Sequence, residues 1–206
     1  MSTIAKSSLR FFLKDGIFSV DRQPVEDCVL EGEELKVLEL KNCTCRNMTF
    51  RNAVTESVII ENCAFINCRF ENTVKGSEGV LLRVTHTSFT ECEFGKLTLI
   101  ADGEESGVEK VHFSHCKFEE SEMTVKGDAQ ALKFYRCEAR DFSYKGEALS
   151  DSDIEEMDLM DVKLEIRAQG NQFEKTAFRN VELIGTTEKN FFKECDMKGY
   201  HFTEKK

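Results

Sequence analysis

The chain has 206 residues, nine cysteines and one proline, and it carries a formal net charge of −10 at pH 7. This length suffices for one domain with a full core, or at most two small ones. No apolar run approaches the roughly 18 to 20 residues that span a bilayer, and the N-terminus lacks the long apolar core of a secretory signal peptide. We therefore expect a protein of the bacterial cytosol without membrane contact.

Residues 1–27 do not follow the pattern of the later chain and are expected to form an N-terminal cap. They contain an apolar cluster that includes Phe11, Phe12 and Phe18, and the only proline, Pro24. A stacked fold needs its first turn covered, because an open end presents unpaired backbone groups. The alternative is that the serine-containing first dozen residues are an export signal of an effector secreted into a host cell.

From Cys28 onward, the chain places an inward-type residue at two positions in every five. Strict alternation would predict a half-buried strand, and spacings of three and four would predict a helix, but here spacings of two and three alternate. This pattern predicts a short strand with both ends pointing inward, a two-residue corner and a further strand. The clearest pairs are Val58 and Ile60, Cys63 and Phe65, and Cys68 and Phe70.

One inward position recurs every 19 to 24 residues along the chain. A step of 20 residues equals four pentads, which predicts four sides per coil, and the longer steps carry polar loops such as VKGSEGV and ADGEESG. We expect a single β-helix domain over residues 28–202 with roughly eight to nine coils, followed by a polar tail at 203–206. The recurring residues are Leu30, Phe50, Phe70, Phe94, Phe118, Ala139, Leu159, Phe178 and Met197.

The cysteines follow the same frame, which predicts that they are free and pack in the core. Free cysteine packs as a small hydrophobe, and Cys43 and Cys45 are too close for the CxxC pairs of a zinc site. Disulfides between stacked coils remain an alternative, because alpha carbons in adjacent strands lie within disulfide range. No metal or cofactor is expected. Six cysteines share one repeat position: Cys28, Cys68, Cys92, Cys116, Cys137 and Cys195.

The repeats CAFIN and CRFEN, with CEFGK, CKFEE and CDMKG after them, resemble pentapeptide repeats. The resemblance covers about residues 28–202 and implies an all-β fold, a right-handed parallel quadrilateral β-helix. Cysteine in place of alanine and the frequent loops indicate a divergent, cysteine-rich member. Some members of the family are DNA-shaped inhibitors or protectors of type II topoisomerases, and some bacterial effectors are similar in carrying such a helix as a recognition domain.

A filled interior restricts function to outward positions, loops and ends. The outward column Arg69, Glu93, Lys117, Glu138 and Asp158 largely alternates in sign, which favours cross-strand pairing and indicates a structural role.

Acidic residues gather between positions 147 and 165, where eight of them face the single Lys163. These carboxylates are either solvated outward positions or a docking site for a basic patch on a protein partner. The candidate partner-binding residues are Asp151, Asp153, Glu155, Glu156, Asp158 and Asp161.

The C-terminus offers a second candidate contact. Tyr200 and Phe202 are followed by TEKK without an evident capping helix. An exposed last coil predicts an end-to-end homodimer or a partner at this end.

Three function classes were weighed. Mimicry of DNA, which carries one charge per about 1.7 Å of axis, needs nearly three uncompensated charges per coil, and only the acidic coil meets that density. No catalytic constellation is evident, because His86, His112, His115 and His201 occupy outward or corner positions without an oriented nucleophile. DNA mimicry is thus the first alternative to a binding scaffold, and a carbohydrate-active β-helix enzyme is the second, but the chain lacks the long loops that form a cleft. We predict a non-enzymatic protein-interaction scaffold that does not bind nucleic acid directly.

Overall fold

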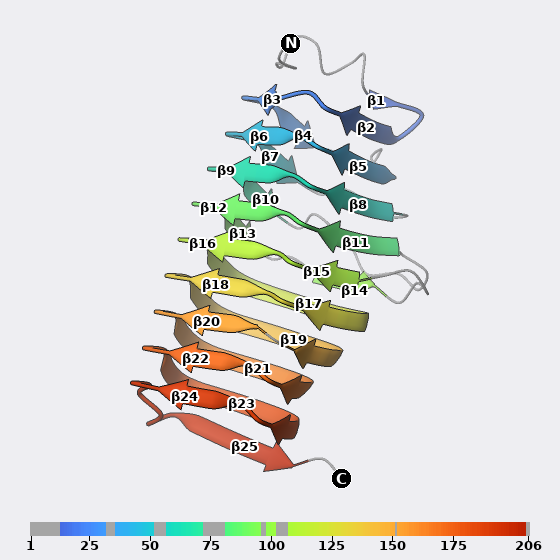
Figure 1. The fold of residues 1–206 in the computed structure, drawn as a ribbon. Coiled ribbons are helices and arrows are strands. Elements are labelled where there is room, and N and C mark those ends of the chain that lie inside the picture. The colour runs from blue at the N-terminus through green and yellow to red at the C-terminus, as the bar shows by residue number, and fades with distance from the viewer. Residues whose placement is uncertain are drawn as a thin grey trace.

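The computed structural model describes residues 13–31, 36–51, 57–71, 81–95, 98–101, 107–150 and 152–204. Over these ranges the regular elements are all strands, and no helix long and apolar enough to cross a membrane occurs among them. The strands wind into a stack of turns that runs from β1 at one end to β25 at the other (Figure 1). The predicted all-β parallel solenoid is confirmed.

One wall of the solenoid is a nine-stranded parallel sheet of short strands. The sequence predicts roughly eight to nine coils. The number of turns described on all four sides is slightly lower, because at several levels the fourth side lies outside the described residues. The strands are β3 (Val25–Glu26), β6 (Thr44–Arg46), β9 (Ala64–Ile66), β12 (Ser88–Thr90), β16 (His112–Ser114), β18 (Lys133–Tyr135), β20 (Asp153–Glu155), β22 (Gln172–Glu174) and β24 (Phe191–Lys193).

A 16-stranded sheet forms the other walls, because its long strands turn corners. Strand β17 pairs with three separate strands in turn, β13, β14 and β15, and so lies on three successive sides. Together with the nine-stranded wall this gives the four sides expected from a 20-residue step. The strands are β1 (Leu13–Lys14), β2 (Ile17–Asp21), β4 (Val29–Glu31), β5 (Val37–Lys41), β7 (Thr49–Arg51), β8 (Ser57–Glu61), β10 (Arg69–Glu71), β11 (Leu81–Thr85), β13 (Glu93–Gly95), β14 (Thr98–Ala101), β15 (Gly107–Glu109), β17 (Lys117–Gln130), β19 (Glu138–Ser150), β21 (Asp158–Gln169), β23 (Ala177–Glu188) and β25 (Tyr200–Glu204).

Parallel stacking begins before Cys28, within the segment expected to be a cap. Strand β2 pairs in parallel with β5, and β3 pairs in parallel with β6. Phe18 and Val25 are fully buried, so the frame of two inward residues in five extends back through this segment. The polar Gln23 conceals it in the sequence. Strand β1, which pairs antiparallel with β2, is the described element that departs from the stack.

Residues with a left-handed backbone form the corners. Among the described residues, φ lies between 46° and 56° at 21 non-glycine positions. The corner amides donate to carbonyls in the next turn; Asn42 N bonds Glu61 O at 2.9 Å, and Asn62 N bonds Thr85 O at 3.0 Å. These bonds offset the cost of a conformation that asparagine tolerates better than most residues do.

Two columns of stacked phenylalanines fill much of the interior. Phe70 stacks on Phe50 with ring centroids 4.8 Å apart and on Phe94 at 5.0 Å. In the facing column, Phe65 stacks on Phe89 at 4.9 Å. The two columns meet edge to face, as in the pair of Phe65 and Phe70 at 5.6 Å. Offset and edge-to-face contacts of this kind add about 0.5–1.5 kcal/mol per pair beyond burial.

The cysteines pack in the core, as predicted. All nine are free, and all but Cys195 are buried. Many of the thiols donate to the carbonyl oxygen of the residue two positions earlier; Cys92 Sγ, for example, lies 3.4 Å from Thr90 O. A small side chain with a weak donor therefore fills the bore and also binds a carbonyl group at the corner.

Candidate interaction surfaces

The structure places most of the predicted acidic residues around one coil. Asp153 and Glu155 lie on β20, Glu156 forms the next corner with φ of 51°, and Asp158 and Asp161 lie on β21. Residue Asp151 falls outside the described residues. The prediction that these carboxylates share a coil therefore holds for the five that the structure describes.

Cations from the coils on either side approach these carboxylates. Glu156 Oε2 lies 2.7 Å from Arg136 Nε on the preceding coil, and Asp158 Oδ2 lies 3.5 Å from an Arg179 nitrogen on the following one. Asp153 is paired with Lys133 at 3.5 Å. Exposed pairs of this kind contribute about 0–1 kcal/mol each. Their main consequence is that the acidic coil carries less uncompensated charge than its sequence indicates.

The charged outward column has the predicted register but its alternation ends early. Arg69 is directly opposite Glu93, and Arg69 Nε donates to Glu93 Oε2 at 2.8 Å. Lys117 follows in register. Glu138 and Asp158 are then direct partners with the same charge sign, which is unfavourable in a cross-strand pair.

Large apolar side chains are exposed on the last coil. Phe191 is 65% exposed and Phe192 is 42% exposed. Met197 and the predicted contact residue Phe202 are also exposed. Exposed apolar side chains on one coil make this end of the tube a candidate interaction surface. We call these four residues the C-terminal tip.

Phe192 is exposed because no described coil follows it, whereas Phe191 occupies an outward position of β24, in register with the exposed Gln172. Phe192 stacks on Phe173 at 4.8 Å, so its second ring face points to the open end. Strand β24 ends the order of its sheet, and β25 pairs with β23 alone among the described strands. The second predicted contact, Tyr200, instead packs edge-on against Phe178 at 5.5 Å, and burial raises the pKa of its hydroxyl.

A shallow, open groove of about 510 Å³ follows one corner of the tube over four levels. Cys43, Cys63 and Thr87 line it together with corner residues and residues of the nine-stranded wall. Its cationic or imidazole-bearing residues are His86, Lys110 and His112, and no acidic residue lines it. The other lining residues are Asn42, Thr44, Asn62, Ala64 and Ser88.

Neither of the two remaining histidines lies in the groove. His115 stands at a corner, with its ring edge-on to Tyr135 at 5.7 Å, and His201 lies exposed on β25. Among the residues that the structure describes, no group of three or more His, Cys, Asp or Glu side chains is placed to hold a metal ion.

Sequence reasoning missed Phe191 and Phe192 of the C-terminal tip and the groove. Phe192 follows Phe173 at the same repeat position, so the pentad frame could have revealed it. The groove arises from small side chains on three successive strands, a signal that becomes visible only once their register is known.

No family model matches the chain, and no curated protein matches it. Among solved structures it is similar to full-length QnrB1, a plasmid-mediated fluoroquinolone resistance protein, with 12% identity and a TM-score of 0.35 over 78% of this chain and 86% of that chain. Two trypsin-treated forms of QnrB1 match with 12% and 13% identity and TM-scores of 0.32 and 0.30. Each of these matches covers 81% of this chain, and they cover 79% and 77% of the QnrB1 chains.

Proposed function

We propose that this chain is a divergent pentapeptide-repeat protein that acts as a non-enzymatic scaffold and binds a protein partner through the C-terminal tip. The exposure of Phe191, Phe192 and Phe202 on one coil carries the proposal. Stacked phenylalanines fill the bore, which favours recognition on the outside of the tube. The frame of two inward residues in five supports the assignment to the repeat family.

A second copy of the chain is the first partner to test. The charges of the last coil are balanced, since Lys193 and Lys198 are close in sequence to Glu194 and Asp196. Two tips related by a two-fold axis can therefore meet without net repulsion, and each covers the apolar face of the other. Open strand edges at the same coil favour the same contact.

Sedimentation velocity of the full chain tests this proposal. We expect a concentration-dependent dimer that the double substitution Phe191→Ser and Phe202→Ser converts to a monomer with an unchanged β-sheet circular dichroism spectrum. The matched control is Ile17→Ser, which removes a 44% exposed apolar side chain from the first coil and should leave the dimer intact. A wild-type protein that stays monomeric at high concentration rejects the homodimer.

If the wild-type chain is a monomer, the C-terminal tip is proposed to bind a different protein. Affinity capture from the native cell with the wild-type chain and with the double variant decides it. Equal recovery of the same proteins by both chains rejects the tip as the contact surface.

The acidic coil is a second proposed contact, for a basic patch on a partner. Asp153, Glu155 and Glu156 lie on the outside of one wall and its corner. Because Arg136 and Lys133 already pair with two of them, a partner must displace these cations. Charge reversal of all three carboxylates should weaken capture of the partner, and unchanged capture rejects this surface.

The two other function classes receive less support from the geometry. Cations between the acidic positions lower the charge density that DNA mimicry needs. A gyrase supercoiling assay at micromolar protein, with neither inhibition nor protection, would remove that alternative. A carbohydrate-active enzyme needs free carboxylates in a cleft. Asp153, Glu156 and Asp158 instead lie on the outside of the tube and are paired with neighbouring cations.

A further inference from the structure

Cys43 and Cys63 occupy equivalent positions in successive turns. Each follows a corner asparagine, and the residues after them, Thr44 and Ala64, are direct register partners. Ala64 N also donates to Cys43 O at 2.9 Å. Because adjacent strands lie about 4.8 Å apart, the two alpha carbons are within the range of a disulfide.

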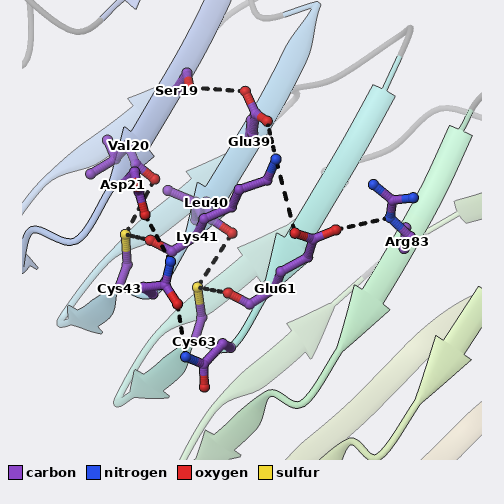
Figure 2. A network of polar contacts seen from close by, with 12 residues as sticks. Ser19, Val20, Asp21, Glu39, Leu40, Lys41, Cys43, Glu61, Cys63 and Arg83 are labelled. Atoms are coloured by element: carbon purple, nitrogen blue, oxygen red, sulfur yellow. Dashed lines mark hydrogen bonds and ion pairs between the residues drawn. The ribbon is translucent and has the colours of Figure 1, made fainter.

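The two thiols make the same kind of carbonyl contact as the other stacked cysteines; Cys116 Sγ, for example, lies 3.4 Å from Phe89 O. Figure 2 shows Cys43 Sγ directed at Val20 O, at 3.3 Å, and Cys63 Sγ directed at Leu40 O, at 3.4 Å. Both residues line the groove that also contains Lys110.

The groove distinguishes this pair from the stacked thiols deeper in the bore. Cys43 and Cys63 are 3% and 4% exposed, the highest values among the buried cysteines. Cys116 and Cys137 also stack on successive turns but are each 1% exposed and do not line the groove. They provide a matched control within the same chain.

We propose that Cys43 and Cys63 form an oxidation site, at which hydrogen peroxide entering the groove converts the two thiols into a disulfide that joins successive turns. This site is independent of the scaffold function proposed above. It lies on the corner of the upper coils, at the opposite end of the tube from the C-terminal tip.

The reaction proceeds in two balanced steps. The Cys43 thiolate attacks one peroxide oxygen, a sulfur–oxygen bond forms, the oxygen–oxygen bond breaks, and the hydroxide that leaves takes up a proton as water. Cys63 then attacks the Cys43 sulfur, the disulfide forms, and the hydroxyl group leaves as water with the Cys63 proton. Two thiols and one peroxide give one disulfide and two waters.

Hydrogen bonding between the thiols lowers the pKa of Cys43 to about 7, and it is the largest cause of the raised pKa of Cys63. The corresponding bond to Cys137 lowers the pKa of Cys116 in the control pair. Access through the groove, and not the thiol pKa, therefore distinguishes Cys43 and Cys63.

Peptide mapping of the native, full-length protein after treatment with hydrogen peroxide tests the site. Trypsin releases Cys43 in residues 42–46 and Cys63 in residues 52–69, and fragmentation distinguishes them from Cys45 and Cys68 in the same peptides. Because Cys43 and Cys63 line the groove and Cys116 and Cys137 do not, we expect the Cys43–Cys63 disulfide to form at least about tenfold faster than a disulfide between Cys116 and Cys137. Equal rates at the two pairs, or unmodified Cys43, overturn the proposal.

A variant that lacks only Cys63 tests the reactivity of Cys43 without removing both thiols. Cys63→Thr introduces the residue that the chain itself has at the next equivalent position, Thr87, which is buried there. In this variant, Cys43 should stop at a sulfenic acid that dimedone traps. Absence of the dimedone adduct in a folded Cys63→Thr protein overturns the proposed oxidation site.

Discussion

The side-chain nitrogen Nδ2 of Asn62 donates a hydrogen bond of 2.8 Å to Oδ1 of Asn42, one turn away along the tube. Asn42 in turn donates to Asp21 Oδ1 at 2.8 Å. Both asparagines have left-handed backbones, with φ of 54° and 53°. The corner therefore combines a tolerated backbone conformation with a side-chain ladder that fixes the register of successive turns.

Substitution of Asn62 should separate these two contributions. Asn62→Gly retains the left-handed backbone and removes the side-chain bond, at an expected cost of about 0.5–1.5 kcal/mol. Asn62→Ala also imposes the left-handed strain and should cost about 1 kcal/mol more. Urea unfolding measures both variants, and an alanine variant as stable as the glycine variant would contradict the strain argument.

Truncation within the phenylalanine columns should depend on position. Phe70 stacks on rings on both sides and is buried, so Phe70→Ala should lower the free energy of unfolding by about 3–5 kcal/mol. The control is Phe191→Ala, at a 65% exposed side chain, which should change stability by less than about 0.5 kcal/mol. Thermal unfolding at low protein concentration, where the proposed dimer dissociates, compares the two; similar losses would be the contrary result.

Glu93 and Glu138 of the outward column should respond in opposite ways to the same substitution, because Glu93 faces a cation and Glu138 faces another carboxylate. Glu93→Gln removes the pair with Arg69 and should destabilise by up to about 1 kcal/mol. Glu138→Gln relieves the contact with Asp158, and should be neutral or stabilising by up to about 0.5 kcal/mol. Denaturant unfolding at low and high salt measures both, and the difference between them should shrink with salt.

Glu39 predicts a dependence of stability on pH. Lys41 Nζ lies 2.8 Å from Glu39 Oε1, and Ser19 Oγ donates to Oε2 at 3.0 Å (Figure 2). These bonds, the one from Lys41 first, lower the pKa of Glu39 from its ordinary value of 4.5. The folded state thus binds this proton less tightly, so its contribution is present above pH 4.5 and is lost as the pH falls below that value.

The variant Glu39→Gln isolates this contribution. It should be less stable than the wild type by under about 1 kcal/mol at pH 7, because the carboxylate is partly exposed. The difference should vanish in acid, as measured by denaturant unfolding at several pH values. A difference that is constant with pH would assign the loss to packing.

A buried polar column predicts a further cost. Asn171 is fully buried, and its Oδ1 accepts a bond of 3.1 Å from Ser152 N. Asn171→Ala leaves that amide without its acceptor and should destabilise by about 1–3 kcal/mol. Asn171→Ser, with the residue found one level earlier, should recover part of the loss, as measured by thermal unfolding. A serine variant no better than alanine would show that the hydroxyl does not reach the amide.

Periodicity failed where a polar residue points inward. Gln23 and Asn171 interrupt the apolar pattern, although the chain around them keeps its register. Asn171 is tolerated inside because Ser152 N on the neighbouring turn donates to its side chain, a partner 19 residues away that no local pattern reveals.

The amino-acid sequence by itself determined the repeating unit. Alternate inward positions and turning corners are properties of a few adjacent residues, so the four-sided stack and the burial of the cysteines followed from the pentad frame. Only the tertiary structure decided the ion pairing of the acidic coil and the exposure of Phe192, because Arg136, Glu156 and Arg179 lie on different turns and no described turn covers Phe192. The ion pairing and the exposure both depend on residues about one coil away in the sequence. Only the packing of one turn on the next shows which of these residues are in contact.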